Sequence, residues 1–386
     1  MKNPPKTAVN TQHFNEENPQ PTPQRQTIVN LLHTQGPLTR QKLVEITGYT
    51  RATVSTLVTQ LQECNALLAT ETQKTSGRGR PTQLLALNRD CPQYIGVAIQ
   101  KLRGTATIHN VIHEPLLSIE VPNPSGIISL EILEKTVREL SVSARQHGLN
   151  LHHLQAVGCA FPGLLPNQRL NVLPNTDSRE LAYAFEAFIE DWFGYKPIID
   201  GTARVAALAE LRHRPALTDC LYFRVSDGVA MTQVVASNLV TGTYRLAGEI
   251  GHITIDPNGI PCFCGKQGCL ETIISNPALC RQSNVPSTYV LLQEWSAGNP
   301  QVRTLLTQAM RIAGAELAHA ALITDPGSII VSWNLTQQIP ELFTILEESI
   351  RNGLLPALRR SIQIEPAILP EVTSCSRGAA YLAAMK

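Results

Sequence analysis

Apolar side chains recur at helical spacing in three short segments near the N-terminus, over residues 22–36, 39–48 and 50–64. Thr39 stands in the N-cap position of the second segment, and Gly48 stands where that helix should end. The side chains expected to face the core are Ile28, Leu31 and Leu32, then Leu43, Val44 and Ile46, and then Val54, Leu57, Val58 and Leu61. Three short helices joined by a tight glycine-containing turn predict a helix-turn-helix unit.

The pattern after Asn65 changes to one that is typical of strands. Residues 66–71 and 82–87 are predicted to form two strands, and the glycine-rich segment 76–81 lies between them. Such a hairpin directly after the third helix predicts the wing of a winged helix-turn-helix.

From Tyr94 onward strands and helices alternate, which predicts an α/β architecture. The expected strands are 94–98, 105–111, 154–161 and 328–333, and the expected helices are 130–147, 302–323 and 378–385. The first 20 residues are rich in Asn, Pro, Gln and Thr and lack apolar periodicity, which predicts a disordered tail. We therefore expect a tail over residues 1–20, a winged helix-turn-helix domain over 21–90 and an α/β domain over 91–386.

The excess of basic side chains is local. The whole chain of 386 residues has a net charge of +1, whereas residues 21–90 hold eight basic and four acidic side chains. Such an excess is suggestive of a nucleic-acid partner. No uninterrupted apolar run approaches the roughly 18 residues that span a bilayer, and the N-terminus lacks the apolar stretch of a signal peptide. We expect a cytoplasmic protein without membrane contact.

The third helix is the candidate for reading DNA, because the second helix of a helix-turn-helix pair enters the major groove. The side chains expected on its exposed face are Arg51, Ala52, Ser55, Thr56 and Thr59. Arg78 and Arg80 in the wing could reach a minor groove, where the negative potential attracts guanidinium groups. The alternative is a small helical module for protein contacts that carries a solvated basic loop.

Four potential metal ligands lie close together in a glycine- and proline-rich segment. They are His252, Cys262, Cys264 and Cys269. One imidazole and three thiolates complete a tetrahedral Zn²⁺ shell, and a full shell predicts a structural ion, not a catalytic one. The alternative is a group of buried free thiols near an unrelated histidine. The other six of the nine cysteines are interpreted as ordinary small apolar residues.

The segments Gly248 to His252 and Cys262 to Glu271 closely resemble the signature of the ROK family, named for repressors, open reading frames and kinases. This resemblance implies a two-lobed, actin-like or hexokinase-like α/β domain, with the lobe boundary near residue 200 and a structural zinc. It also implies a sugar site between the lobes, in which Glu249, His252 and Glu271 match the residues that bind sugar hydroxyls. A purely structural role for the two glutamates is the alternative.

Departures from the family's kinases decide the expected activity. The kinases carry an Asn-Asp pair whose Asp is the general base, whereas this chain has Gly201-Thr202, and a threonine hydroxyl cannot take up a proton at neutral pH. Asp200 is a weak substitute, because it should point away from the site. The glycine-rich phosphate loops are also replaced, at residues 97–102, 226–231 and 331–334. We expect no catalytic residue.

The combined pattern predicts a transcriptional regulator, a repressor of carbohydrate-related genes whose kinase-like domain is a sensor. The expected partners are operator DNA, a sugar or sugar-phosphate effector, and further copies of the chain in a homodimer or homotetramer. Two alternatives remain open. One is an active sugar or amino-sugar kinase that also binds DNA, and the other is a regulator whose sensor domain binds a protein.

Overall fold

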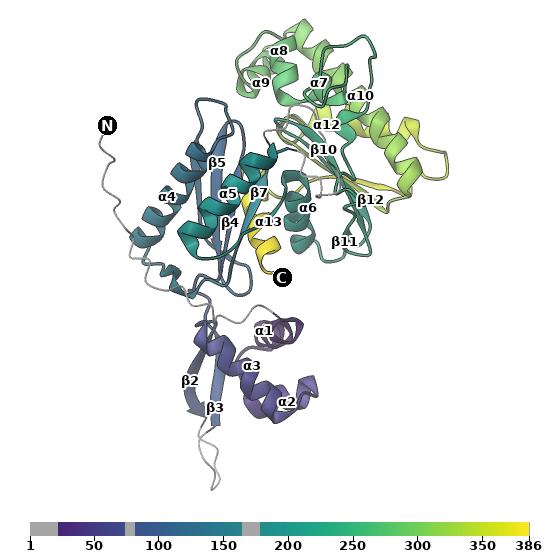
Figure 1. The fold of residues 1–386 in the computed structure, drawn as a ribbon. Helices are drawn as coiled ribbons and strands as arrows, with labels where there is room; N and C mark the ends of the chain where they lie inside the picture. Colours follow the sequence, from purple (N-terminus) through teal and green to yellow (C-terminus); the bar gives the residue numbers. More distant parts are fainter. Residues whose placement is uncertain (1–21, 74–81, 164–177, 386) are drawn as a thin grey trace, which may run out of the picture.

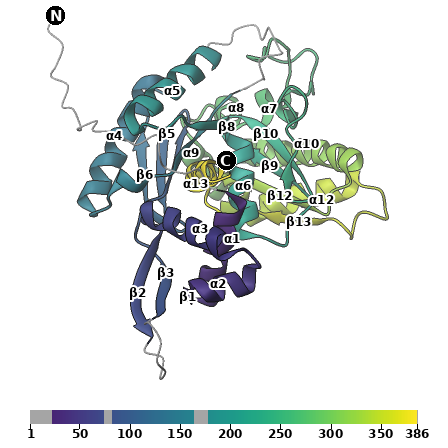
Figure 2. The ribbon, with the colours of Figure 1, turned by 60° about the horizontal axis from the view of Figure 1, so that its bottom comes forward.

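The N-terminal part of the computed structural model, which describes residues 22–73, 82–163 and 178–385, consists of three helices and a small sheet. Its elements are α1 (Pro23–Gln35), β1 (Leu38–Thr39), α2 (Arg40–Thr47), α3 (Arg51–Glu63), β2 (Leu67–Gln73) and β3 (Thr82–Leu87). The β2–β3 hairpin projects away from the rest of the chain (Figures 1 and 2). The arrangement has the form of a winged helix-turn-helix. The predicted Arg78 and Arg80 lie outside the described residues, as does the predicted tail.

Threonine side chains begin all three of these helices. The hydroxyl oxygen of Thr22 accepts the N–H of Arg25, that of Thr39 accepts the N–H of Lys42, and that of Thr50 accepts the N–H of Thr53. Each contact satisfies one backbone donor that has no partner within its helix. The sequence therefore sets the starting points of the helices locally, and it does so where the pattern predicted.

The buried side of α3 is the predicted one, because Val54, Leu57, Val58 and Leu61 are all within 6% of full burial. The prediction for Ile46 was wrong, since its side chain is 37% exposed. The reason is geometric. Ile46 lies about 200° around the helix axis from Val44, so a helix that turns Leu43 and Val44 toward the core leaves Ile46 at the edge.

The remainder of the chain forms two five-stranded sheets. The first has the order β6 (Pro115–Pro122), β5 (Arg103–His109), β4 (Tyr94–Ile99), β7 (Ala156–Phe161) and β8 (Ile198–Gly201), and α4 (Leu130–Gln146) and α5 (Ser178–Phe193) pack against it. The second has the order β11 (Asn238–Leu239), β10 (Val229–Val235), β9 (Cys220–Val225), β12 (Ser328–Trp333) and β13 (Gln363–Pro366). The other helices are η1 (Leu151–His153), α6 (Thr202–His213), η2 (Ile250–His252), α7 (Leu270–Ile274), α8 (Asn276–Gln282), α9 (Thr288–Ser296), α10 (Pro300–Thr324), α11 (Asn334–Gln338), α12 (Pro340–Gly353) and α13 (Glu371–Ala383). This is the expected α/β fold with two lobes.

The C-terminal helix α13 returns to the first sheet and lies between that sheet and α6 (Figure 1). Its contacts are too close for side chains at three glycines, Gly96, Gly158 and Gly378. A Cβ atom on Gly96 of β4 would lie 1.9 Å from the carbonyl oxygen of Ser376, and one on Gly378 would lie 1.7 Å from that of Val205. The helix starts at Glu371, seven residues before the predicted start at Gly378, because its first two turns carry polar side chains with partners in both lobes, Glu371 with Arg224 and Ser376 with Thr107.

The N-terminal unit joins the first lobe through buried contacts. The predicted strand 105–111 ended two residues too late, because β5 ends at His109. Val111 and Ile112 follow it and belong to the hydrophobic core of the N-terminal unit. The buried Arg25 donates to Cys64 Sγ at 3.3 Å and to Gln155 Oε1 at 3.4 Å. These contacts link α1 and the C-terminal end of α3 to the segment that precedes β7 of the first sheet.

Two buried histidines flank this junction. The rings of His109 and His113 both pack edge-on against Tyr381 of α13, with centroids 5.1 and 5.4 Å away, and His113 also stacks on Tyr94. His213 and Arg212 of α6 and Arg377 of α13 are the neighbouring charged or titratable groups. Burial, with some help from these groups, lowers the pKa of each of the two histidines to about 3. Both rings are therefore neutral in the folded protein.

No helix within the described ranges is long and apolar enough to cross a membrane.

We expect the folded state to lose stability as the pH falls below the ordinary histidine pKa of about 6.5, because the unfolded chain then binds protons that the folded chain excludes. Each of the two rings should lower the free energy of unfolding by about 2 kcal/mol between pH 7.5 and pH 5. The variant His109→Phe keeps an aromatic ring against Tyr381 but cannot take up a proton. It should therefore reduce the loss of unfolding free energy by about 2 kcal/mol. Urea unfolding at both pH values measures this, with exposed His319→Gln as the control. If His109→Phe and the unaltered protein lost the same free energy of unfolding between the two pH values, His109 would not be neutral in the folded protein.

Candidate functional site

A cavity of about 470 Å³ lies between the two lobes. The first lobe contributes Gln100 and Phe161 to its wall, and the second contributes the β9–β10 turn. All three predicted ligand-binding residues, Glu249, His252 and Glu271, line this cavity. Residues from distant parts of the sequence thus converge on a space large enough for a small molecule.

The two glutamates differ in how they are held. Glu271 Oε2 accepts the backbone N–H of Val229 at 2.9 Å, and no hydrogen bond to another described residue is recorded for the Glu249 carboxyl group. Burial raises the pKa of Glu249 to about 7, while Arg204 opposes the shift and Glu271 adds to it. Burial also raises the pKa of Glu271. Glu249 therefore offers an acceptor that its own chain leaves open.

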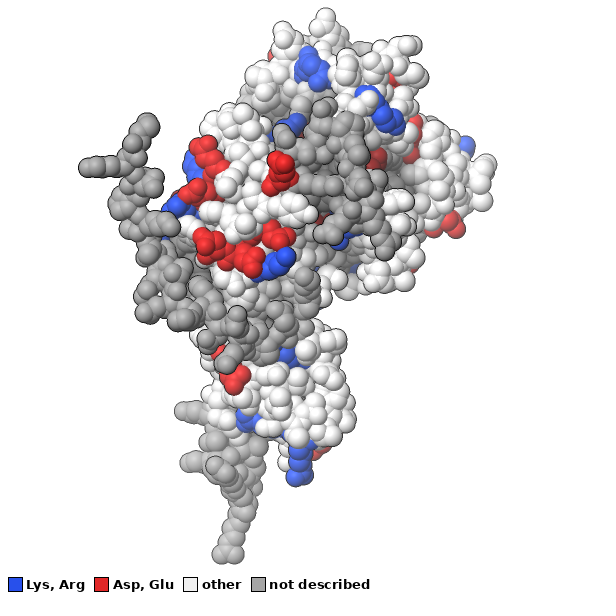
Figure 3. Space-filling model, in the orientation of Figure 1, with Lys and Arg blue, Asp and Glu red and all other residues white. Residues whose placement is uncertain are grey.

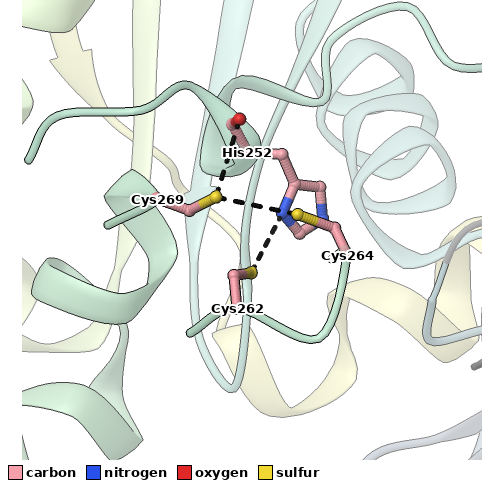
Figure 4. A group of neighbouring side chains, drawn as sticks. All are labelled: His252, Cys262, Cys264 and Cys269. Carbon is pink, nitrogen blue, oxygen red and sulfur yellow. Dashed lines mark hydrogen bonds between the residues drawn. The ribbon is translucent and has the colours of Figure 1, made fainter. Parts of the chain in front are cut away.

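The four predicted metal ligands come together beside the cavity (Figure 4). Their ligand atoms all lie within 4.8 Å of one another, with His252 Nδ1 3.6 Å from Cys262 Sγ and Cys264 Sγ 3.7 Å from Cys269 Sγ. A tetrahedral site with Zn–S bonds of 2.3 Å has S···S edges of about 3.8 Å. The donor set and its spacing fit a metal ion, so these residues could hold one.

Metal-ligand candidates and cavity residues alternate along two short segments. Glu249 is the N-cap of the turn η2, which ends at His252, and Cys269 is the N-cap of α7, whose second residue is Glu271. An ion held by His252 and Cys269 would therefore also fix the backbone from which both glutamates extend. The Nδ1 atom of His252 is the ring nitrogen that faces Cys262, and the His252 residue also lines the cavity.

Thr202 lines the cavity, whereas Asp200 does not. The Oδ1 atom of Asp200 accepts from Arg204 Nε at 2.6 Å and lies 3.1 Å from Arg245 Nη2. Asp200 is therefore turned away from the cavity and is committed to two guanidinium groups.

Sequence reasoning missed the charged groups that join the lobes. Asp227 Oδ2 on the β9–β10 turn accepts the backbone N–H of Lys101 on the β4–β5 turn at 3.0 Å. Glu371, the first residue of α13, accepts from Arg224 Nη2 at 2.8 Å and from the Ser226 hydroxyl at 2.7 Å. No local pattern indicates such pairs, because their members are 126 to 147 residues apart.

The candidate DNA-reading side chains share one exposed face of α3. They are Arg51, Ala52, Ser55, Thr56 and Thr59, and each is exposed. No ion pair to another described residue is recorded for Arg51. On the face shown in Figure 3, acidic side chains gather over α4 and α5 of the first lobe, while the N-terminal unit carries both basic and acidic side chains.

Comparison with known proteins gives a consistent result. The ROK family model matches residues 94–386. The chain is 25% identical over 349 residues to a xylose repressor of Bacillus spizizenii, which covers 86% of this chain and 88% of that protein.

Solved structures show the same fold. A ROK family transcriptional regulator, described as a homolog of the E. coli MLC protein, superposes with a TM-score of 0.71 at 21% identity, covering 93% of this chain and 95% of that one. A ROK family glucokinase from Streptomyces griseus, in complex with glucose and AMPPNP, superposes with a TM-score of 0.65 at 23% identity. The match covers 76% of this chain and 99% of that one. The regulator thus matches nearly the whole chain, whereas the kinase covers only about three quarters of it.

Proposed function

We propose, from the premise that this chain belongs to the ROK family, that it is a sequence-specific DNA-binding repressor of carbohydrate-related genes. The observation that carries the proposal is the exposed polar face of α3, on a three-helix unit that precedes the family region of residues 94–386. The relative called a xylose repressor supports the same function, since its similarity extends over 86% of this chain.

The α3 face suits close approach to a major groove. Ala52 is small, the hydroxyl groups of Ser55 and Thr56 can reach bases or the sugar-phosphate backbone, and Arg51 can pair with guanine or with a phosphate. Arg78 and Arg80 of the wing, outside the described residues, would add contacts in a minor groove. In a dimer, two such helices would read half-sites about one helical turn apart.

The cavity serves ligand binding and not phosphoryl transfer in this proposal. Thr202 stands where a kinase of the family has its general base, and Asp200 is held by Arg204 and Arg245. The β4–β5 turn also lacks the glycines that would let backbone N–H groups cradle a nucleotide phosphate. What remains is a set of acceptors, above all Glu249 and Glu271, that can bind sugar hydroxyl groups.

The metal that we assign to His252, Cys262, Cys264 and Cys269 is a structural Zn²⁺ ion. Three thiolates and one imidazole are borderline-soft ligands that suit zinc, and together they leave no open position for a substrate. Its contribution would be to hold η2 and the start of α7 in place, and with them the cavity glutamates.

Helix α13 is the candidate route from the cavity to DNA. Its first residue, Glu371, holds Arg224 at the cavity, and its Tyr381 packs against His109 beside the junction that contains Ile112. A ligand that changes the separation of the lobes would move α13 together with the N-terminal unit. The spacing of the two α3 helices in a dimer would then no longer match the operator.

We expect the intact protein to bind a two-fold-related operator, with an affinity that falls steeply as salt is added, because basic side chains displace counterions from phosphates. Ser55→Ala and Arg51→Ala should each shift the preference among operator variants by about 1 to 3 kcal/mol per lost base contact. Fluorescence titration with operator variants, after selection of bound genomic fragments, measures this.

Arg145→Ala is the matched control for Arg51→Ala, because it removes an exposed arginine from α4 instead of α3. It should leave operator preference unchanged. A chain that binds every sequence with equal affinity at physiological salt would contradict the proposed function.

Purified protein should contain about one tightly held zinc ion per chain, because thiolate-rich sites bind strongly and couple binding to folding. Cys264→Ser should lose the metal and lower the midpoint of thermal unfolding, whereas Cys280→Ser, at an equally half-buried cysteine outside the cluster, should retain it. Elemental analysis measures the zinc content per chain. Protein that is purified without chelator and contains no zinc would contradict the assignment of a zinc site.

The protein should not phosphorylate sugars. With ATP, magnesium and a panel of hexoses and N-acetylhexosamines, we expect product only at the uncatalysed background, since both the base and the phosphate loops are missing. A coupled assay for ADP release measures this. Turnover that disappears in Thr202→Val or Asp200→Asn would instead establish a kinase.

A further inference from the structure

We infer that the interlobe cavity takes an uncharged polyhydroxy ligand, such as a free sugar, and discriminates against phosphorylated sugars and nucleotides. The inference rests on the proposed function in one respect, namely that the cavity is a ligand site. The inference goes beyond the proposed function because it distinguishes a free sugar from a sugar phosphate as the ligand. The distinction follows from how the charges around the cavity are paired.

Each of the two buried cations of the cavity wall is held by a carboxylate of the chain, and Arg204 shares its partner Asp200 with Arg245. Arg204 pairs with Asp200, with Nη2 2.5 Å from Oδ1 and side chains that are 6% and 9% exposed. Arg224 pairs with Glu371 at 2.8 Å, with side chains that are 6% and 12% exposed. Such short and buried contacts hold each guanidinium group in place, and neither is free to turn toward a phosphate.

A carboxylate of the chain itself occupies a backbone donor that an anionic ligand would need. The half-buried Asp227 reaches from the second lobe to the N–H of Lys101 at 3.0 Å. Lys101 lies in the tight turn between β4 and β5, closed by a hydrogen bond from the N–H of Gln100 to the carbonyl oxygen of Arg103 at 2.8 Å. An incoming phosphate would have to displace Asp227 and would then face its negative charge.

The other ionisable groups of the cavity wall are mainly carboxyl groups. Among the described residues that line it, Asp227, Glu249 and Glu271 are the acidic ones, and the exposed ammonium group of Lys101 is the one cation without a buried carboxylate partner. A dianionic phosphate would thus meet up to three carboxyl groups, each repelling it when ionised.

Hydroxyl groups meet the opposite situation. Each can donate to a carboxylate oxygen, and Glu249 has no partner recorded among the described residues. The second oxygen of Glu271 also remains, since its Oε2 holds Val229. The apolar wall that includes Phe161 and Val229 can pack against the C–H face of a sugar ring.

Matched pairs of ligands test the inference on the full-length, zinc-loaded chain. Isothermal titration calorimetry is performed with D-glucose and glucose 6-phosphate, with N-acetyl-D-glucosamine and its 6-phosphate, with D-xylose, and with ATP. We expect at least one free sugar to bind, its phosphate at least about tenfold more weakly, and ATP not at all.

Asp227→Asn should reduce the ratio of the affinity for the free sugar to the affinity for its phosphate. The substitution removes one negative charge that repels the phosphate and weakens the contact with Lys101. Asp219→Asn is the control, since Asp219 also accepts a backbone N–H on the second sheet, that of Ala236 at 3.1 Å, but does not line the cavity. This control variant should show the same ratio of the two affinities as the unaltered protein.

Two results would overturn the inference: a sugar phosphate that binds as tightly as its free sugar or more tightly, and a panel in which no free sugar binds. The operator titration described above is run on the same preparations without sugar. Because it does not depend on any ligand, it separates a failure of the ligand assignment from a failure of the proposed repressor function.

Discussion

The close packing of α13 between the first sheet and α6 is the constraint on which the two-lobed arrangement depends. Its backbone approaches β4 and α6 so closely that Gly96 and Gly378 leave no room for a Cβ atom. Contacts of this kind have little freedom to adjust, because protein interiors are packed as densely as organic crystals. The last helix of the chain thereby stays in close contact with both the first sheet and α6, and it ends beside the junction with the N-terminal unit.

Charge pairing across the lobes gives the cavity its chemical character. Asp227 bonds to the first lobe, and Glu371 bonds to Arg224 and Ser226 of the second. In a kinase of this fold, comparable space must admit phosphates, whereas in this chain its own carboxylates engage the available donors. The same protein scaffold can therefore support either phosphoryl transfer or ligand sensing, and the difference lies in a few residues at turns and helix ends.

Much of the N-terminal unit was predictable, because its signals are local. Threonine caps, glycine at the end of α2 and apolar residues at helical spacing each act within a few positions, and the structure has α1 to α3 where these signals placed them. The cluster of one histidine and three cysteines that could hold a metal ion was also predictable, since its four members fall within one short segment. The extension of the second strand to Val111 was wrong, because burial of this residue comes from the N-terminal core and not from a continued sheet.

The sequence by itself determined the element types, the starts of α1 to α3, the candidate DNA-reading face of α3 and the residues of the candidate metal and ligand sites, since each of these depends on neighbours close along the chain. Only the tertiary structure decided that Asp200 is turned away from the cavity and that Asp227 and Glu371 bridge its walls. It also decided that α13 starts at Glu371 and links the cavity to the junction. These features arise from contacts between residues more than one hundred positions apart or from packing around a buried helix, and a linear pattern carries no record of which distant side chains will meet.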